Sequence, residues 1–335
     1  MELLTNAQML LVFACSFLVS IWFLRWRAFY RRLPPTPWYI PLLGSPQLYS
    51  SSMHLQLTKT GQKYGGIYTL HMTTSPLVVL SSYSAIKAAL VRQAVDFSDR
   101  FTFPFSSKEL RLEGDKHQEE GDKLKEVFRE DLIWRAIHDM FAAGTDTTTY
   151  TILWLILLMM EYPDVQTKVQ SEVDNVIGQS RPPSLTDRAQ MPYTEATLME
   201  VQRFRTVAPY VPPRAVPRDV EIMGYSIPKG TQVWVNLWGA LNDPSHWSNP
   251  ECFDPSRFLS DDGEHVIVPE AYIPFGAGRR ACLGETLAKM ELFLFCTNFM
   301  QRFTFIRNST TPLDLSGRIG ITFIPRSYET VVVRR

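Results

Sequence analysis

The chain has 335 residues, of which 45% are hydrophobic, enough for one large or two ordinary domains with a hydrophobic core. Its 34 Lys and Arg residues balance its 34 Asp and Glu residues, and this zero net charge argues against a protein that binds nucleic acid. Neither a disulfide framework nor a zinc module is predicted, because the four cysteines are widely spaced: Cys15, Cys252, Cys282 and Cys296.

An uncharged, mostly apolar segment lies at the start of the chain. No residue from Leu3 to Leu24 is charged, and this segment is long enough to cross a bilayer as a helix. A cleaved secretory signal is the alternative, but such a signal carries positive charge before the apolar run, whereas here Glu2 precedes it. The basic residues follow instead, at Arg25, Arg27, Arg31 and Arg32. This asymmetry predicts a single transmembrane anchor over residues 1–24, with the rest of the chain in the cytosol.

The next segments have different compositions. Residues 25–46 are basic and rich in proline, which predicts a stiff, extended hinge. Ile67–Met72 and Leu77–Ser81 then predict a hairpin, and Tyr83–Val95 predicts a short helix. From Ser106 to Glu130, 14 of 25 residues are charged, which is typical of a solvated linker that leads into a helix.

Helices dominate the second half of the chain. Glu126–Tyr162 contains no proline and a single glycine, so it predicts a long helix that Pro163 ends. Its segment Thr151–Met160 is apolar all round and is expected to be buried. Further helices are predicted from Val165 to Val176, Tyr193 to Phe204 and Leu283 to Met300, with short strands at Glu221–Ile227, Gln232–Asn236, Ile321–Ile324 and Thr330–Val333. The predicted fold class is mainly α with small β-sheets.

One cysteine lies in an unusual setting. Cys282 is surrounded by Gly276, Gly278 and Gly284, which permit tight turns and a close approach of the backbone to another group. The helix predicted just after it directs free N–H groups toward the sulfur and favours the thiolate. Three interpretations compete: a buried inert cysteine, a phosphate-binding glycine loop and a haem-iron ligand. The phosphate loop is the weakest match, because no βαβ unit surrounds it.

Several motifs resemble those of one family in their order along the chain. The loop resembles the haem-binding signature of the cytochromes P450, Phe275-x-x-Gly278-x-Arg280-x-Cys282-x-Gly284. Upstream, Ala143–Thr147 resembles the family's oxygen-activation motif, Glu200-x-x-Arg203 its Glu-x-x-Arg pair, and Pro255–Phe258 its Pro-x-Arg-Phe segment. Together with the anchor and the hinge, the chain resembles the microsomal P450s of animals that act on drugs, steroids and fatty acids.

The resemblance implies a role for each residue. Cys282 is expected to be the axial thiolate ligand of haem b iron. Gly144 is expected to let the long helix pass close over the haem and to ease a local break in its hydrogen bonds. Asp146 and Thr147 are expected to carry protons to bound dioxygen, although an ordinary polar helix face remains the alternative for Thr145–Thr149. The implied cofactor-binding residues are Phe275, Gly278, Arg280, Gly284, Arg214 and Arg100, the three arginines binding the propionates, and the implied structural ion pairs join Glu200, Arg203 and Arg257.

The resemblance also implies an activity and a departure from the family. Residues 47–335 resemble a P450 haem domain from which a block of helices is missing near 105/106, so we expect an incomplete P450 fold. The implied activity is a monooxygenase that inserts one oxygen atom from O2 into an apolar organic substrate. Its electrons would come from NADPH through cytochrome P450 reductase, at the endoplasmic reticulum membrane. The alternative, which the missing block favours, is a non-catalytic membrane-anchored form that binds haem weakly or not at all.

Overall fold

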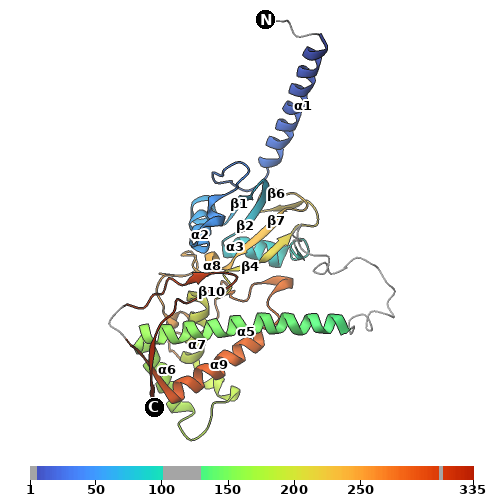
Figure 1. Cartoon of the computed structure of the whole chain (residues 1–335). Helices are drawn as coiled ribbons and strands as arrows, with labels where there is room; N and C mark the ends of the chain where they lie inside the picture. The colour runs from blue at the N-terminus through green and yellow to red at the C-terminus, as the bar shows by residue number, and fades with distance from the viewer. Residues whose placement is uncertain (1–5, 101–129, 309–311) are drawn as a thin grey trace, which may run out of the picture.

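The computed structural model describes residues 6–100, 130–308 and 312–335, and one long helix stands away from the body (Figure 1). This helix, α1 (Asn6–Tyr30), carries exposed apolar side chains such as Leu10, Phe13 and Phe17. In the part of the chain that the structure describes, no helix combines the length and the hydropathy needed to span a membrane. The predicted anchor also includes residues 1–5, which lie outside the described ranges.

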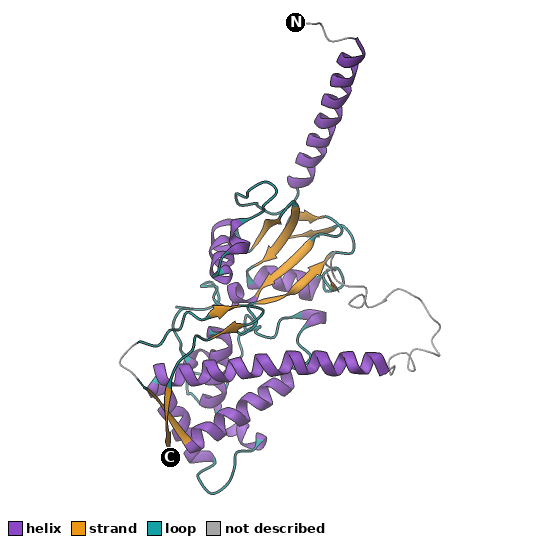
Figure 2. Cartoon of the chain, in the orientation of Figure 1, coloured by secondary structure: helices purple, strands orange, loops and turns teal. Residues whose placement is uncertain are grey.

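A five-stranded sheet forms the part of the body next to α1 (Figure 2). Its strand order is β1-β2-β7-β4-β3, with β2 and β7 parallel and the other neighbours antiparallel. The strands are β1 (Ile67–Met72), β2 (Ser75–Leu80), β7 (Gln232–Asn236), β4 (Tyr210–Ala215) and β3 (Asp99–Arg100). Pairing of β3 with β4 places Arg100 opposite Arg214, so residues far apart in sequence become neighbours.

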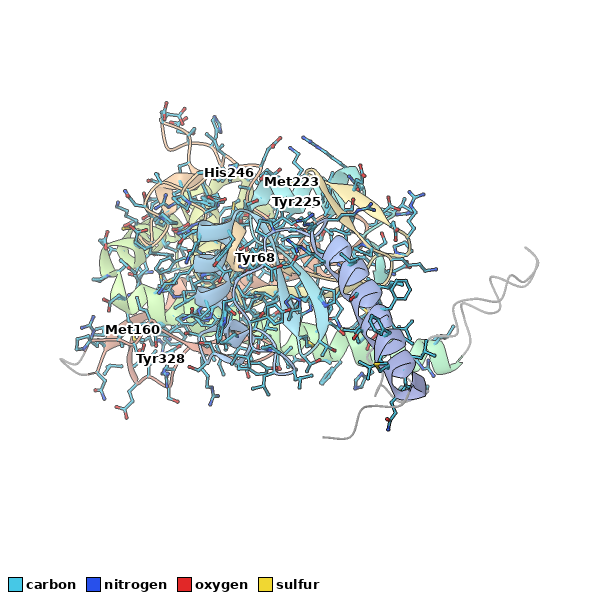
Figure 3. All side chains as sticks on the ribbon, turned by 90° about the horizontal axis from the view of Figure 1, so that it is seen from above. Tyr68, Met160, Met223, Tyr225, His246 and Tyr328 are labelled. Carbon is cyan, nitrogen blue, oxygen red and sulfur yellow. The ribbon has the colours of Figure 1, made fainter. Side chains whose placement is uncertain are left out.

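Short helices cover this sheet. They are α2 (Met53–Tyr64), α3 (Tyr83–Lys87) and α8 (Leu237–Leu241). Tyr68 on β1 lies in the middle of the body when seen from above (Figure 3), and its hydroxyl donates to the carbonyl of Leu57 on α2 at 2.8 Å. Both side chains are fully buried, so this contact fixes α2 against the sheet.

Four longer helices form the second part of the body: α5 (Glu130–Glu161), α6 (Pro163–Val176), α7 (Pro192–Phe204) and α9 (Glu285–Arg302). The apolar segment Thr151–Met160 of α5 lies among them and is mostly buried, as predicted. Trp154 is fully buried and its indole N–H donates to the carbonyl of Phe323 at 3.1 Å. The helix ends at Glu161, before Pro163, in agreement with the proline stop expected from the sequence.

Three two-stranded sheets complete the described structure. They pair β5 (Val220–Ile222) with β6 (Tyr225–Ile227), β8 (Phe303–Arg307) with β11 (Thr330–Arg334), and β9 (Arg318–Ile319) with β10 (Phe323–Ile324). The Tyr328 hydroxyl donates to the carbonyl of Leu153 at 2.9 Å and ties the C-terminal segment to α5. Tyr328 and Met160 of α5 lie near the same end of the body (Figure 3).

Several elements differ from those predicted. The helix α1 continues to Tyr30, inside the segment expected to be an extended hinge, and six of the described α-helices and strands have no counterpart in the prediction: α2, α8, β3, β4, β8 and β9. The helix expected over Tyr83–Val95 is α-helical only to Lys87 and continues as a wider turn over Ala88–Arg92. Strand β4 was not predicted, because Pro212 and Pro213 lack the N–H groups that a strand ladder uses. The structure accommodates both prolines where the register between β4 and β7 shifts, between Val211 and Arg214. Nearly all of the predicted linker at 106–130 lies outside the described residues.

Candidate functional site

The loop that precedes α9 takes its shape from two glycines in the left-handed region. Gly276 has φ 77° and Gly278 has φ 72°, values that residues with a Cβ adopt with strain. A Cβ on Gly278 would lie 1.8 Å from the carbonyl oxygen of Leu90, so glycine alone fits there. The backbone N–H of Cys282 donates to the carbonyl of Phe275 at 2.9 Å and closes the loop. The loop thereby holds the cysteine backbone in place.

The thiol of Cys282 lies at the start of α9. Gly284 occupies the N-cap position of this helix, and a Cβ on Gly284 would be 3.8 Å from the Cys282 sulfur. The free N–H groups and the dipole of a helix N-terminus stabilise a thiolate. The side chain is exposed, so an external ligand can reach it.

The other three cysteines lie in different surroundings. Cys296 is fully buried within α9, and burial raises the pKa of its thiol to about 12, so it stays protonated at neutral pH. Cys15 lies on α1, and Cys252 is exposed in another loop, where its carbonyl accepts hydrogen bonds from arginine side chains. Cys282 is therefore the one cysteine that combines exposure with the glycine loop and a helix N-terminus.

Three arginines converge beside this loop. Arg214 on β4 is 5% exposed, and its Nη2 donates to the carbonyl of Arg280 at 3.5 Å. Arg280 in turn donates from Nε to the carbonyl of Ser98 at 3.1 Å, and Arg100 lies opposite Arg214 across the strand pair. Burial, and then the charges of Arg280 and Arg100, lower the pKa of Arg214. The buried Nε of Arg214 has no hydrogen-bond partner, so the cluster is suited to an anionic ligand.

The motif on α5 lies in an unbroken α-helix. The expectation of a local break at Gly144 is wrong, since α5 is α-helical from Glu130 to Glu161. The hydroxyl of Thr145 donates to the carbonyl of Phe141, and that of Thr147 to the carbonyl of Ala143, both at 2.7 Å. Both bonds run to the carbonyl one turn earlier in the same helix, the usual back-bonding of a threonine inside an α-helix.

The helix α5 and the loop that carries Cys282 meet at a small cavity. Thr147 on α5 and Phe275 in the cysteine loop both line it, and its volume is about 40 Å³. This is far below the roughly 300–1,000 Å³ of a small-molecule pocket, so a larger ligand would occupy the exposed face. Gly144 and Asp146 lie on exposed helix, and no atom lies within 4 Å of a Cβ placed on Gly144.

A buried ion pair lies on α7. Arg203 donates from Nε and Nη2 to the two carboxylate oxygens of Glu200 at 2.6 and 2.7 Å, and both side chains are fully buried. Arg203 also donates to the carbonyls of Leu241 and Cys252, and Nε of Arg257 lies 3.5 Å from Glu200. Burial raises the pKa of Glu200, and the Arg203 charge opposes this rise. The cluster joins α7 to α8 and to the segment that carries Arg257.

Some contacts of the site could not be found by sequence reasoning. The Lys289 ammonium lies 5.5 Å from the ring centre of Phe275, and the Thr148 hydroxyl donates to Glu291 at 3.3 Å. Both contacts depend on how α9 packs against the cysteine loop and α5, and the sequence alone does not predict that packing. The helical spacing of Lys289 from the cysteine could have suggested a residue near the loop, but not its ring contact.

Comparison with known proteins gives matches over most of the chain. The sequence matches the family model described as Cytochrome P450 over residues 34–116 and 107–332. It is 49% identical over 223 residues to human "Cytochrome P450 2U1", an alignment covering 65% of this chain and 41% of that protein. It is 40% identical over 238 residues to "Steroid 17-alpha-hydroxylase/17,20 lyase" of Ictalurus punctatus, covering 70% of this chain and 46% of that protein. The matched region thus spans less than half the length of these curated relatives.

Proposed function

The chain belongs to the cytochrome P450 family, and we propose that it is a haem-thiolate protein of the monooxygenase type, with Cys282 as the iron ligand. The observation that carries this proposal is the position of Cys282, exposed at the N-terminus of α9 in a loop that requires Gly278. A thiolate at this place is available to a metal from outside the chain.

The residues present fit haem b. Its two propionates are carboxylates, and the cluster of Arg100, Arg214 and Arg280 includes a buried guanidinium N–H without a hydrogen-bond partner. The thiol of Cys282 matches the soft ligand that favours O–O cleavage. When bound, haem supplies the activation of dioxygen and the insertion of one oxygen atom into a C–H bond.

The side chains of this chain have three tasks in the proposed reaction. Cys282 holds the iron and donates electron density to it, and the three arginines orient the propionates. Asp146 and Thr147 move protons from solvent at their carboxylate and hydroxyl oxygens. The exposed position of Asp146 supports exchange of its proton with water, and Thr147 lies on the cavity that Phe275 also lines. The buried Glu200–Arg203 pair keeps α7 in place without touching the reacting atoms.

We further propose that the chain is anchored by the segment Leu3–Leu24 in the endoplasmic reticulum membrane, with the body in the cytosol. The exposed apolar side chains along α1 and its position away from the body support an environment other than water. Electrons then come from NADPH through cytochrome P450 reductase. An apolar organic substrate fits the names of relatives such as the steroid hydroxylase of Ictalurus punctatus.

A second candidate function is a non-catalytic, membrane-anchored form with weak or no haem binding. The exposure of Gly144, Asp146 and Cys282 favours it, because a monooxygenase site excludes bulk water. It rests on the proposal that a helix block is missing near 105/106, and it predicts the same fold without turnover.

Reconstitution distinguishes the two. The full chain is loaded with haem in vesicles with reductase and NADPH, and is given a panel of steroids and fatty acids under labelled dioxygen. The proposed function predicts products that carry one labelled oxygen atom and a rate about 10²–10⁴ lower for Asp146→Asn at unchanged haem content. A chain that fails to take up haem, or haem-loaded protein that forms no labelled product, supports the non-catalytic form instead. Equal rates for Asp146→Asn and wild type return Asp146 to an ordinary polar helix face.

A further inference from the structure

The first half of α5 carries a surface that the proposed function does not use. Every residue from Ile133 to Asp146 is exposed, because this half of the helix extends beyond the rest of the body (Figure 1). The helix becomes partly covered at Thr147, where it meets the cysteine loop.

Large apolar side chains recur along this half at intervals of three and four residues, which places them on one helix face. We call them the apolar stripe: Ile133 (43% exposed), Trp134 (65%), Ile137 (52%), Met140 (58%) and Phe141 (76%). At 100° per residue, Arg135, Asp139 and Ala142 lie on the opposite face. The exposed half of α5 is therefore amphipathic. Among the described residues, α5 packs against the body only through its second half, from Thr147 onward.

We propose that the apolar stripe is a self-association surface, on which a second copy of the chain packs its own stripe in the antiparallel direction. The positions of the side chains are self-complementary about Ile137. In an antiparallel pair centred there, Ile133 lies level with Phe141 of the other copy, and Trp134 lies level with Met140. Each level therefore joins two large apolar side chains, as a two-fold symmetric interface requires.

The charges of this segment are compatible with the pairing. Arg135 and Asp139 face away from the stripe, so an antiparallel pair leaves them in water and buries neither.

The surface is large enough for a specific dimer. A large aromatic side chain buries about 150–250 Å² when fully covered, so Trp134 and Phe141 from two copies supply several hundred Å². The three aliphatic side chains of each copy bring the total to roughly the 1,000 Å² that a specific interface needs. The share of one copy is about 500 Å², comparable to the largest apolar patch of a typical monomer, and patches of this size commonly mark interaction sites.

Cross-linking tests the geometry. Ile137→Cys places two thiols at the two-fold axis, and mild oxidation of the detergent-solubilised full chain should yield a dimer linked through position 137 on both copies. The matched control is Ala142→Cys, an exposed position on the opposite face, which should give only the wild-type background from the native cysteines. Equal cross-linking at positions 137 and 142 would overturn the proposal.

Sedimentation velocity tests the energetics. Ile137→Asp introduces two facing carboxylates at the axis and should weaken dimerisation at least tenfold, whereas Ala142→Asp should leave it unchanged. Both positions are exposed, and circular dichroism checks that both variants keep their helix content. A wild-type chain that is monomeric at tens of micromolar contradicts the proposal. A dimer that survives Ile137→Asp places the contact elsewhere, for example on α1, and also contradicts it.

Discussion

At the scale of single residues, Arg214 in the arginine cluster is expected to lower the stability of the cofactor-free chain and to strengthen the binding of a carboxylate. Arg214 is buried beside two other cations, which lowers its pKa, and its Nε lacks a partner. An uncompensated buried charge costs free energy in the cofactor-free chain. The same charge stabilises a bound carboxylate. One side chain is therefore expected to act with opposite sign in the two states.

The variant Arg214→Met tests this expectation. Removing the charge should raise the free energy of unfolding of the cofactor-free chain by about 1 kcal/mol or more, measured by urea titration. The same variant should lose haem faster when its transfer to apomyoglobin is followed. Arg218→Met is the control, because Arg218 is exposed and paired with Asp96, and it should not accelerate haem loss. An Arg214→Met chain that is less stable without cofactor contradicts the account.

A second residue predicts how stability depends on pH. His54 on α2 is buried against Trp238 and Phe323, and its Nδ1 has no hydrogen-bond partner. Burial, followed by the charge of Arg205, lowers its pKa from 6.5 to about 4. Between these values the unfolded chain binds more protons than the folded chain, so the free energy of unfolding falls as the pH drops from about 6.5 to 4.

The size of this loss is roughly 3 kcal/mol, from 1.36 kcal/mol per pKa unit. His54→Phe should flatten the dependence in this window, measured as urea midpoints from pH 4 to 7. The control His265→Phe changes an exposed side chain and should keep the wild-type slope. An unchanged slope in His54→Phe would show that other groups cause the acid sensitivity.

At the scale of elements, the cysteine loop depends on a contact between segments far apart in the chain. Gly278 lies against the carbonyl of Leu90, at the turn that follows α3. Gly276 has a similar positive φ, but no atom lies within 4 Å of a Cβ placed there. A side chain at Gly276 would therefore meet only backbone strain, whereas a side chain at Gly278 would meet backbone strain and a steric clash with Leu90.

Alanine at each position measures the difference. Gly276→Ala carries only the cost of a positive φ, on the order of 1 kcal/mol. Gly278→Ala carries this cost and a steric clash, which should lower the free energy of unfolding by about 1–3 kcal/mol more. Urea unfolding of both variants gives the comparison. Equal losses would mean that the loop does not pack on Leu90 in solution.

The elements also show how far local sequence determines structure. The hairpin of β1 and β2, the helix α7 and the burial of Thr151–Met160 follow from periodicity and breakers, so the sequence predicts them. Strand β4 pairs with β3, more than a hundred residues earlier in the chain, and with β7, and its two prolines gave no strand signal. The resemblance around Cys282 indicated the candidate ligand and named Arg100, Arg214 and Arg280 as propionate-binding residues. The pairing of β3 with β4 gives the physical reason that two of these arginines are neighbours.

At the scale of the whole molecule, the candidate site is assembled but open. The ion pair on α7, the arginine cluster and the cysteine loop have their contacts, while Gly144 and Asp146 face solvent. The chain matches less than half the length of its curated relatives. Because water can reach both faces of the site, we expect incomplete haem loading and turnover well below that of a full-length relative, measured under identical reductase and NADPH concentrations.

The reduced carbon monoxide difference spectrum tests the central claim, that Cys282 is the thiolate ligand. We expect the haem-reconstituted full chain to give a thiolate-type Soret band of less than stoichiometric intensity. Cys282→Ser should abolish this band, whereas Cys252→Ser, an exposed cysteine outside the glycine loop, should retain it. A thiolate band that persists unchanged in Cys282→Ser would contradict the account.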